Sequence, residues 1–160
     1  MKNIIFPLLL LIVISCREPV PQKAIVIDLE GMTHLMDGAP EKLQVINFWA
    51  TWCKPCVDEL PAFEKLQAAY KDDIDVILIS LDDAENLESK VNPFLKKNNI
   101  QSQVKLLNHP YAAEYIPMVD QHWDGAIPVT LLKYKNQKKF FNQEFQYKEL
   151  ETEVLSLMNK

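Results

Sequence analysis

Two short apolar runs, separated by a stretch of helical periodicity, restrict the fold of this chain more than any other feature. Residues 43–49 (LQVINFW) and residues 74–81 (IDVILISL) have the composition of buried strands. Apolar residues recur at helical spacing between them, which predicts a helix over residues 54–70 with a kink at Pro61. A strand, a helix and a second strand in this order predict two parallel strands joined by a right-handed crossover.

The rest of the chain extends this unit into an α/β fold. Before this unit, we expect a strand or hairpin within 24–36, and after it a helix over 83–98, interrupted at Asn92-Pro93, and a strand over 103–107. Residues 110–123 are expected to form short helical turns, because Pro117 breaks a longer helix. An antiparallel hairpin of 127–134 and 138–145 follows, and then a closing helix with one apolar face: Tyr147, Leu150, Val154 and Leu157. This order predicts a mixed central sheet with helices on both faces and a short N-terminal extension.

The N-terminal segment has the pattern of an export signal. The apolar run from Ile4 to Ile14 is too short for a comfortable membrane-spanning helix. It ends in Val-Ile-Ser-Cys, which resembles the lipobox of bacterial lipoproteins and predicts lipidation at Cys16. A plain signal peptide, with Cys16 left free or removed, is the alternative. The predicted organisation is a signal peptide over 1–15, a lipidated Cys and tether over 16–23, and one domain over 24–160.

The charge balance restricts the class of partner. The chain has 22 acidic and 17 basic residues and a formal charge of −5. A mildly acidic protein is a poor match for nucleic acid or for an anionic lipid surface, so membrane attachment is expected to come from acyl chains at Cys16. We expect a monomer.

The stretch WATWCKPC contains Cys53 and Cys56, the only cysteines besides Cys16. A bridge between them closes a very small loop, so it constrains the unfolded chain little and is a weak structural staple. A zinc site needs more ligands than one pair supplies, and the histidines show no ligand spacing: His34, His109 and His122. We therefore expect no metal and favour a reversible redox pair.

The position of the pair, directly after a strand and at the start of a helix, suits thiol chemistry. The unpaired N–H groups at a helix N-terminus favour a thiolate and lower its pKa, which predicts Cys53 as the exposed nucleophile. Cys56, one turn later, is placed to attack a mixed disulfide on Cys53. Pro55 stiffens the first turn. Lys54 either stabilises the nearby thiolate or simply faces solvent.

The motif WATWCKPCVDELP, followed by Gly125-Ala126-Ile127-Pro128-Val129-Thr130, resembles the thioredoxin superfamily, specifically the TlpA/ResA-type extracytoplasmic thiol-disulfide oxidoreductases. The resemblance implies a thioredoxin fold. It also implies a cis peptide bond before Pro128, beside the cysteines, and a role for the Ile127 main chain in pairing with an extended substrate. Trp52 is the implied substrate-facing residue. The alternative is that Pro128 merely starts a strand.

A glutamate near the pair has an implied role in proton transfer. Cytosolic thioredoxins have a buried aspartate at the position of Asn47, whereas ResA-like proteins carry a glutamate three residues after the second cysteine. Glu59 occupies that place. If it is buried with a raised pKa, Glu59 can accept the proton of Cys56. The alternative is a solvated helix residue.

The resemblance implies a membrane-tethered enzyme that exchanges disulfides with cell-envelope proteins and faces the periplasm, in the direction of reduction. Its partners would be protein thiols and disulfides and a membrane-linked electron donor. No cofactor is expected besides the Cys53–Cys56 pair. Two alternatives stay open: a thiol peroxidase of the peroxiredoxin type, and a thioredoxin-like binding module without catalysis.

Overall fold

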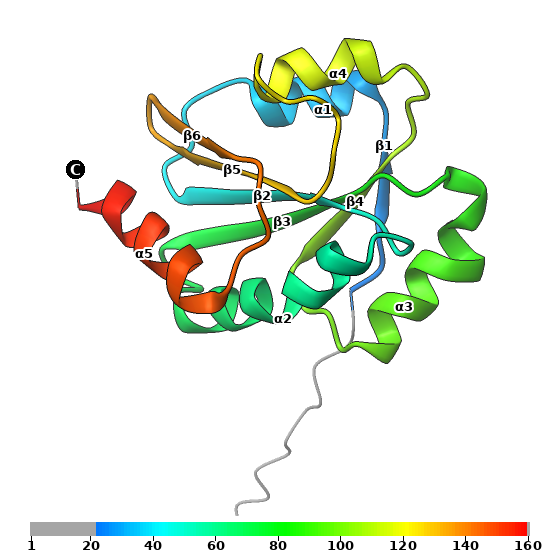
Figure 1. Cartoon of the computed structure of the whole chain (residues 1–160), viewed down its shortest axis with the longest axis horizontal. Coiled ribbons are helices and arrows are strands. Elements are labelled where there is room, and N and C mark those ends of the chain that lie inside the picture. The colour runs from blue at the N-terminus through cyan, green and yellow to red at the C-terminus, as the bar shows by residue number, and fades with distance from the viewer. Residues whose placement is uncertain (1–21, 160) are drawn as a thin grey trace, which may run out of the picture.

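The computed structural model describes residues 22–159, which build one six-stranded sheet in the order β1-β4-β3-β2-β5-β6 (Figure 1). The strands are β1 (Ile25–Ile27), β2 (Leu43–Trp49), β3 (Ile74–Ser80), β4 (Gln103–Leu107), β5 (Val129–Tyr134) and β6 (Gln137–Phe141). The helices are α1 (Leu29–Met36), α2 (Lys54–Ala69), α3 (Asn92–Lys97), α4 (Ala112–Val119) and α5 (Tyr147–Met158), with a 3₁₀ turn at Ala84–Asn86 and a π-helical turn at Leu87–Val91 before α3. The predicted signal peptide and Cys16 lie outside the described residues.

The central unit of the prediction is confirmed. β2 and β3 pair in parallel, with Leu43 opposite Ile74, and α2 crosses between them. On its other side β2 pairs antiparallel with β5, so the sheet is mixed. α2 continues through Pro61 over 16 residues. Because β1, β4, β3 and β2 run in parallel, the chain segments that follow these strands all lie at the same end of the strands, their C-terminal end.

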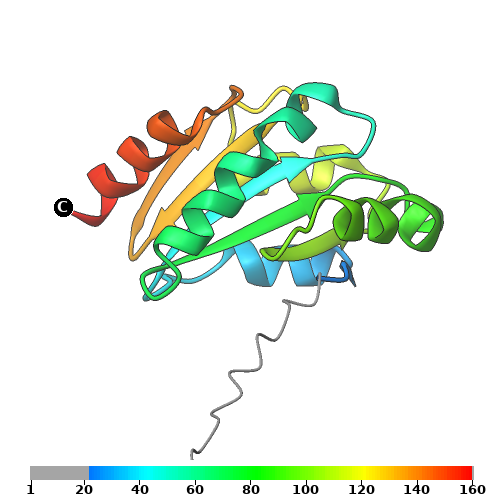
Figure 2. The ribbon, with the colours of Figure 1, turned by 90° about the horizontal axis from the view of Figure 1, so that it is seen from below.

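Helices cover both faces of the sheet, as predicted. α1 and α4 lie together over one face, while α2, α3 and α5 lie over the other (Figures 1 and 2). Each layer buries its own apolar cluster: Met32, Ile46, Phe48, Ile79, Tyr115 and Trp123 on the first face, and Val45, Trp49, Phe63, Leu78, Leu150 and Val154 on the second. β2 contributes alternate side chains to both clusters, as expected for a central strand.

The N-terminal extension differs in part from the prediction. Residues 25–27 form the predicted strand, which pairs in parallel with β4 at the edge of the sheet. The residues that follow do not return as a hairpin but form α1. Asp28 caps this helix by accepting the N–H of Gly31 at 2.9 Å, and Met32 and Met36 are buried one turn apart. A capping aspartate and an apolar pair at helical spacing therefore favour the helix.

Two further predictions need correction. Residues 112–119 form the continuous helix α4, with Pro117 inside it. A helix of two turns loses only one main-chain hydrogen bond to the proline, so Pro117 does not break it. The last predicted strand ends at Phe141 rather than at residue 145, because the chain there leaves the sheet to reach α2.

A buried lysine joins α1 to the sheet. Lys133 on β5 is 1% exposed, and its Nζ donates to the main-chain oxygens of Leu35 at 2.7 Å and Met36 at 2.9 Å. These carbonyls end α1, where the helix dipole favours a cation. Burial lowers the pKa of Lys133. The charge therefore fixes the C-terminal end of α1 against β5.

Among residues 22–159, no helix combines the length and the apolar character that crossing a membrane requires.

Candidate active site

The two cysteines lie at the start of α2, directly beyond the central strand β2. Cys53 is the N-cap of the helix: its Sγ accepts the N–H of Cys56 at 3.4 Å, and its main-chain oxygen accepts that of Val57 at 3.0 Å. Cys53 and Cys56 form a disulfide, with Cα atoms 5.3 Å apart. Pro55 lies in the first turn, where its missing N–H removes no helical hydrogen bond. The structure thus has the oxidised form of the predicted pair.

Cys53 is more accessible than Cys56, but the difference in exposure between the two is smaller than predicted. Cys53 is 6% exposed and Cys56 is fully buried, so Cys53 is not the openly exposed residue that its position in the sequence suggested. The disulfide bond to Cys56 and the nearby Ile127 cover it. The order is as predicted, with Cys53 the more accessible. The exposed member of the motif is Trp52, at 70%.

The loop before β5 lies beside the sulfur of Cys53. The carbonyl oxygen of Ile127 is 3.7 Å from Cys53 Sγ, although the two are 74 residues apart in sequence. The Ile127–Pro128 peptide is cis, as the resemblance implied. Pro128 is buried, and β5 begins one residue later. The structure therefore brings Ile127 and Pro128 to the disulfide. Main-chain pairing of Ile127 with a substrate stays a prediction.

Trp123 also supports this loop. Its ring is 4% exposed and lies 4.9 Å from the ring of Phe48. Its Nε1 donates a 2.7 Å hydrogen bond to the carbonyl oxygen of Ala126, directly before Ile127. The sequence feature that could have indicated this supporting role is the position of a tryptophan a few residues before Ile127 and Pro128.

Glu59 is buried one helical turn beyond Cys56, and it is 1% exposed. Its Oε1 accepts the Nδ2–H of Asn47 at 2.7 Å, and its Oε2 accepts the N–H of Phe145 at 2.8 Å. Burial raises the pKa of Glu59 from 4.5 to about 7 against the opposing effect of both hydrogen bonds, and the charge of Glu144 adds to the rise. Glu59 is therefore buried and has a raised pKa, as its predicted role in accepting the proton of Cys56 requires.

Asn47 joins this carboxyl to the strand that follows Pro128. Its Nδ2 also donates to Thr130 Oγ1, at 3.2 Å, and both residues are fully buried. Within the described part of the chain, Asn47 Oδ1 has no hydrogen-bond partner. A neutral amide thus stands where cytosolic thioredoxins have an aspartate, and Glu59 carries the titratable proton of this cluster.

Lys54 points away from this buried cluster. Its Nζ pairs with Asp58 Oδ2 at 2.5 Å, one turn along α2, and 83% of its side chain is exposed. The hydrogen bond and the charge of Asp58 raise the pKa of Lys54. This arrangement is that of a solvent-facing ion pair. An effect of Lys54 on the thiol stays a prediction.

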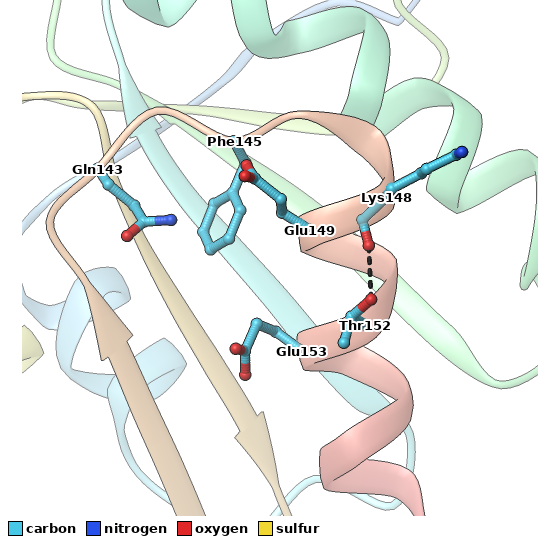
Figure 3. Close-up of a pocket in the computed structure, with 6 residues that line it drawn as sticks. All are labelled: Gln143, Phe145, Lys148, Glu149, Thr152 and Glu153. Carbon is cyan, nitrogen blue, oxygen red and sulfur yellow. Dashed lines mark hydrogen bonds between the residues drawn. The ribbon is translucent and has the colours of Figure 1, made fainter.

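Phe145, which the sequence did not indicate as a site residue, is a main-chain partner of Glu59. Its side chain lines a hollow of about 430 Å³ beside α5, together with the polar residues Gln143, Lys148, Glu149, Thr152 and Glu153 (Figure 3). Its main-chain N–H donates to Glu59. None of the predicted site residues lines the hollow.

Within residues 22–159, no group of three or more His, Cys, Asp or Glu side chains is arranged to hold a metal ion. Each histidine has one carboxylate neighbour: Glu30 for His34, Glu114 for His109 and Asp120 for His122.

Solved structures support the fold. A thioredoxin-related protein from Neisseria meningitidis serogroup B superposes with a TM-score of 0.65 at 24% sequence identity, over 76% of this chain and 88% of that one. At this identity the likeness shows the thioredoxin fold alone, which confirms the fold class predicted from the sequence.

Curated proteins of similar sequence are named for thiol chemistry. The thioredoxin-like protein YneN of Bacillus subtilis is 34% identical, over 51% of this chain and 55% of its own length. The thiol-disulfide oxidoreductase ResA of a Bacillus cereus strain is 37% identical, over 51% of this chain and 46% of its own length. The chain thus spans about half the length of these relatives. The model of the AhpC/TSA family matches residues 19–138, which include both cysteines and Pro128. With most of its length covered by that match, the chain belongs to the AhpC/TSA family.

Proposed function

We propose that this protein is a thiol-disulfide oxidoreductase that exchanges disulfides with other proteins through Cys53 and Cys56. The observation that carries the proposal is the Cys53–Cys56 disulfide at the N-terminus of α2, with Cys53 Sγ 3.7 Å from the carbonyl oxygen of Ile127. The names of the ResA relatives support the same activity. We propose that the pair works without a bound cofactor.

In the direction of reduction, the cycle begins with the dithiol. The Cys53 thiolate attacks a disulfide of the partner protein, forms a mixed disulfide and releases one partner thiolate. Cys56 then loses its proton and attacks Cys53 Sγ. This step forms the Cys53–Cys56 disulfide and releases the second partner thiol. Two electrons pass to the partner in total, and its two sulfurs take up two protons, which balance the two that Cys53 and Cys56 lose.

Glu59 is the proposed acceptor of the Cys56 proton. With a pKa of about 7, the carboxyl is divided between its acid and base forms near neutral pH. A group in this range can both take a proton and return it. Its position one turn after Cys56, inside the protein, supports this role.

Trapping with two serine variants tests the proposed chemistry. Cys56→Ser should accumulate mixed disulfides with partner proteins on Cys53, because the resolving thiol is absent. Cys53→Ser is the matched control and should trap none. Equal trapping by both variants would contradict the assignment of nucleophile and resolver.

The direction of transfer needs a separate measurement. We propose that the protein acts as a reductase, supplied by a membrane-linked electron donor. Rapid alkylation of intact cells should then find the Cys53–Cys56 pair mainly as free thiols. A pair that is mainly oxidised would favour oxidation of partners instead.

We further propose that the protein is exported and held at the membrane by lipid on Cys16, facing the periplasm. The sequence Val-Ile-Ser-Cys supports this location. Cys16→Ala should move the protein from the membrane fraction to the soluble fraction, whereas Cys56→Ser should leave it in place. Unchanged membrane association of the Cys16→Ala protein would rule out the lipid anchor.

Two assays separate the alternatives. A thiol peroxidase would consume hydrogen peroxide through Cys53 with a reducing thiol present, and the proposed oxidoreductase should instead reduce a protein disulfide faster than peroxide. A binding module without catalysis would do neither, and stoichiometric metal in the purified protein would support a metal-carrying role.

A further inference from the structure

A buried aspartate that the proposed chemistry does not use lies beneath the loop that carries the cysteines. Asp82 follows β3 and is 3% exposed. Its Oδ2 accepts the main-chain N–H of Thr51 at 2.9 Å, and its Oδ1 accepts the hydroxyl of the same residue at 2.5 Å. Ser80 Oγ also donates to Oδ2, at 2.9 Å. In the part of the chain that the structure describes, no ion pair includes Asp82.

The residue that Asp82 holds begins the turn to the first cysteine. Thr51 and Trp52 form this turn, which the N–H of Cys53 closes by donating to the oxygen of Ala50 at 3.1 Å. The turn has few other supports, since Trp52 is 70% exposed. Both carboxylate oxygens of Asp82 bind Thr51, one through its main chain and one through its side chain, so the contact fixes the position and the rotation of the turn.

Cys53 itself has a second support that is independent of Asp82. Its main-chain oxygen accepts the N–H of Val57 in the first turn of α2, at 3.0 Å. Loss of the Asp82 contact should therefore displace Thr51 and Trp52 more than it displaces the sulfur. Trp52 is the residue that a protein substrate would meet next to the sulfur, whereas a small disulfide needs the sulfur alone.

We propose that Asp82 is a positioning residue for protein substrates: acting through Thr51, it holds Trp52 and Cys53 so that one partner segment can contact both. The inference rests on the proposed oxidoreductase function. Burying a carboxylate without a cation is costly, and an apolar residue at this site would avoid that cost. Two hydrogen bonds to one turn residue give the carboxylate a use that an apolar residue could not replace.

The test compares a protein disulfide with a small one. Asp82→Ala should raise KM for the reduction of insulin disulfides about tenfold, whereas the rate of the reduced protein with 5,5′-dithiobis(2-nitrobenzoate) should change less than about twofold. Thr51→Val removes only the hydroxyl contact and should raise KM by a smaller factor. Asp82→Asn should restore most of the loss, because its oxygen can accept the Thr51 N–H while its amide donates to the hydroxyl.

Ser80→Ala is the matched control for a purely structural role. It removes a hydrogen bond to the same carboxylate, and also the acceptor of the Asp82 main-chain N–H, but leaves both contacts with Thr51. This variant should unfold at a lower temperature and keep KM for insulin within about twofold of the parent value. An equal rise in KM for Ser80→Ala and Asp82→Ala, or an equal slowing with both disulfides, would overturn the positioning role.

Hydrogen exchange of the oxidised protein supplies a readout that does not depend on activity. The amides of Thr51 and Trp52 should exchange faster in Asp82→Ala than in Ser80→Ala, and equal exchange in the two variants would overturn the proposal. A parent protein that reduces neither disulfide would contradict the proposed function. A parent that reduces both, with no change of KM in Asp82→Ala, would contradict this inference alone.

Discussion

The main-chain N–H of Phe145 donates a 2.8 Å hydrogen bond to Oε2 of Glu59, across 86 residues of sequence. This bond joins the helix that carries the cysteines to the segment between β6 and α5. The same segment places Glu144 where its charge raises the pKa of Glu59. The pKa of Glu59 therefore depends in part on Glu144 and Phe145, which follow the last strand of the sheet and are far in sequence from the cysteine motif.

The raised pKa of Glu59 predicts a pH-dependent stability. The folded protein holds this proton more strongly than the unfolded chain does, since the pKa is about 7 in the first and 4.5 in the second. The stability from this group is thus fully present below about pH 4.5 and is lost as the pH rises through 7. Glu59→Gln should remove this dependence, so that the difference in unfolding free energy between variant and parent changes by about 3 kcal/mol from pH 4 to pH 8.

Urea unfolding of the oxidised protein at several pH values measures this difference. Glu85→Gln, at an exposed position before α3, is the control, and its difference from the parent should change with pH less than that of Glu59→Gln. A constant difference for Glu59→Gln as well would show that the carboxyl is not perturbed by burial.

The unequal burial of the two cysteines predicts the order of their alkylation. Cys53 is 6% exposed and lies at the helix N-terminus, whereas Cys56 is fully buried. After reduction, iodoacetamide should modify Cys53 at least about tenfold faster than Cys56 at neutral pH, because Cys53 is the more accessible of the two and lies where helix N–H groups favour a thiolate. Mass spectrometry of peptides after short reaction times gives the two rates. Faster modification of Cys56 would reverse the assignment.

The exposed indole of Trp52 predicts a role in substrate contact without a role in stability. Trp52→Ala should raise KM for a protein disulfide about fivefold and change the melting temperature little, since a side chain that is 70% exposed supports few core contacts. Ile25→Ala is the matched control: Ile25 is 58% exposed on the edge strand β1, which β4 and β3 separate from β2. Equal effects of both variants on KM would argue against a docking surface around Trp52.

The buried cation of Lys133 predicts a large loss of stability from a small change. Lys133→Met keeps most of the side-chain volume but leaves the last carbonyls of α1 without their donor, which should cost about 3 kcal/mol in unfolding free energy. Lys71→Met, at an exposed position, should cost less than about 0.5 kcal/mol. Denaturant unfolding measures both. A neutral Lys133→Met would mean that water replaces the ammonium group at no cost.

The parts of the fold that the sequence predicted well are those with strong local signals. β2, α2, β3 and β4 follow from apolar periodicity, and their bounds match the prediction closely. The cysteine pair and the loop at Pro128 could be associated only through the resemblance, because residues 53 and 128 have no local pattern in common. Within 24–36, the strand was predicted and the hairpin alternative was wrong, because Asp28 caps a helix after the strand.

The environment of the site was harder to predict than its residues. Glu59 could be named from its spacing to Cys56, but its burial depends on Phe145, which arrives from another part of the chain. Asp82 had a weaker signal: it follows a strand parallel to β2, so it had to lie at the same edge of the sheet as the cysteines. Long-range contacts of this kind depend on the assembled sheet and leave no periodicity in the sequence.

The bond between Phe145 and Glu59 also has a consequence for the order in which the protein matures. β2, α2 and β3 are complete in the nascent chain long before residues 142–159 leave the ribosome. Until that last segment docks, Glu59 lacks one of its two donors and the cover that keeps water from its carboxyl. A partly synthesised chain can therefore already hold both thiols while the burial that raises the pKa of Glu59 is still incomplete. The proposed proton transfer near neutral pH therefore depends on the docking of residues 142–159.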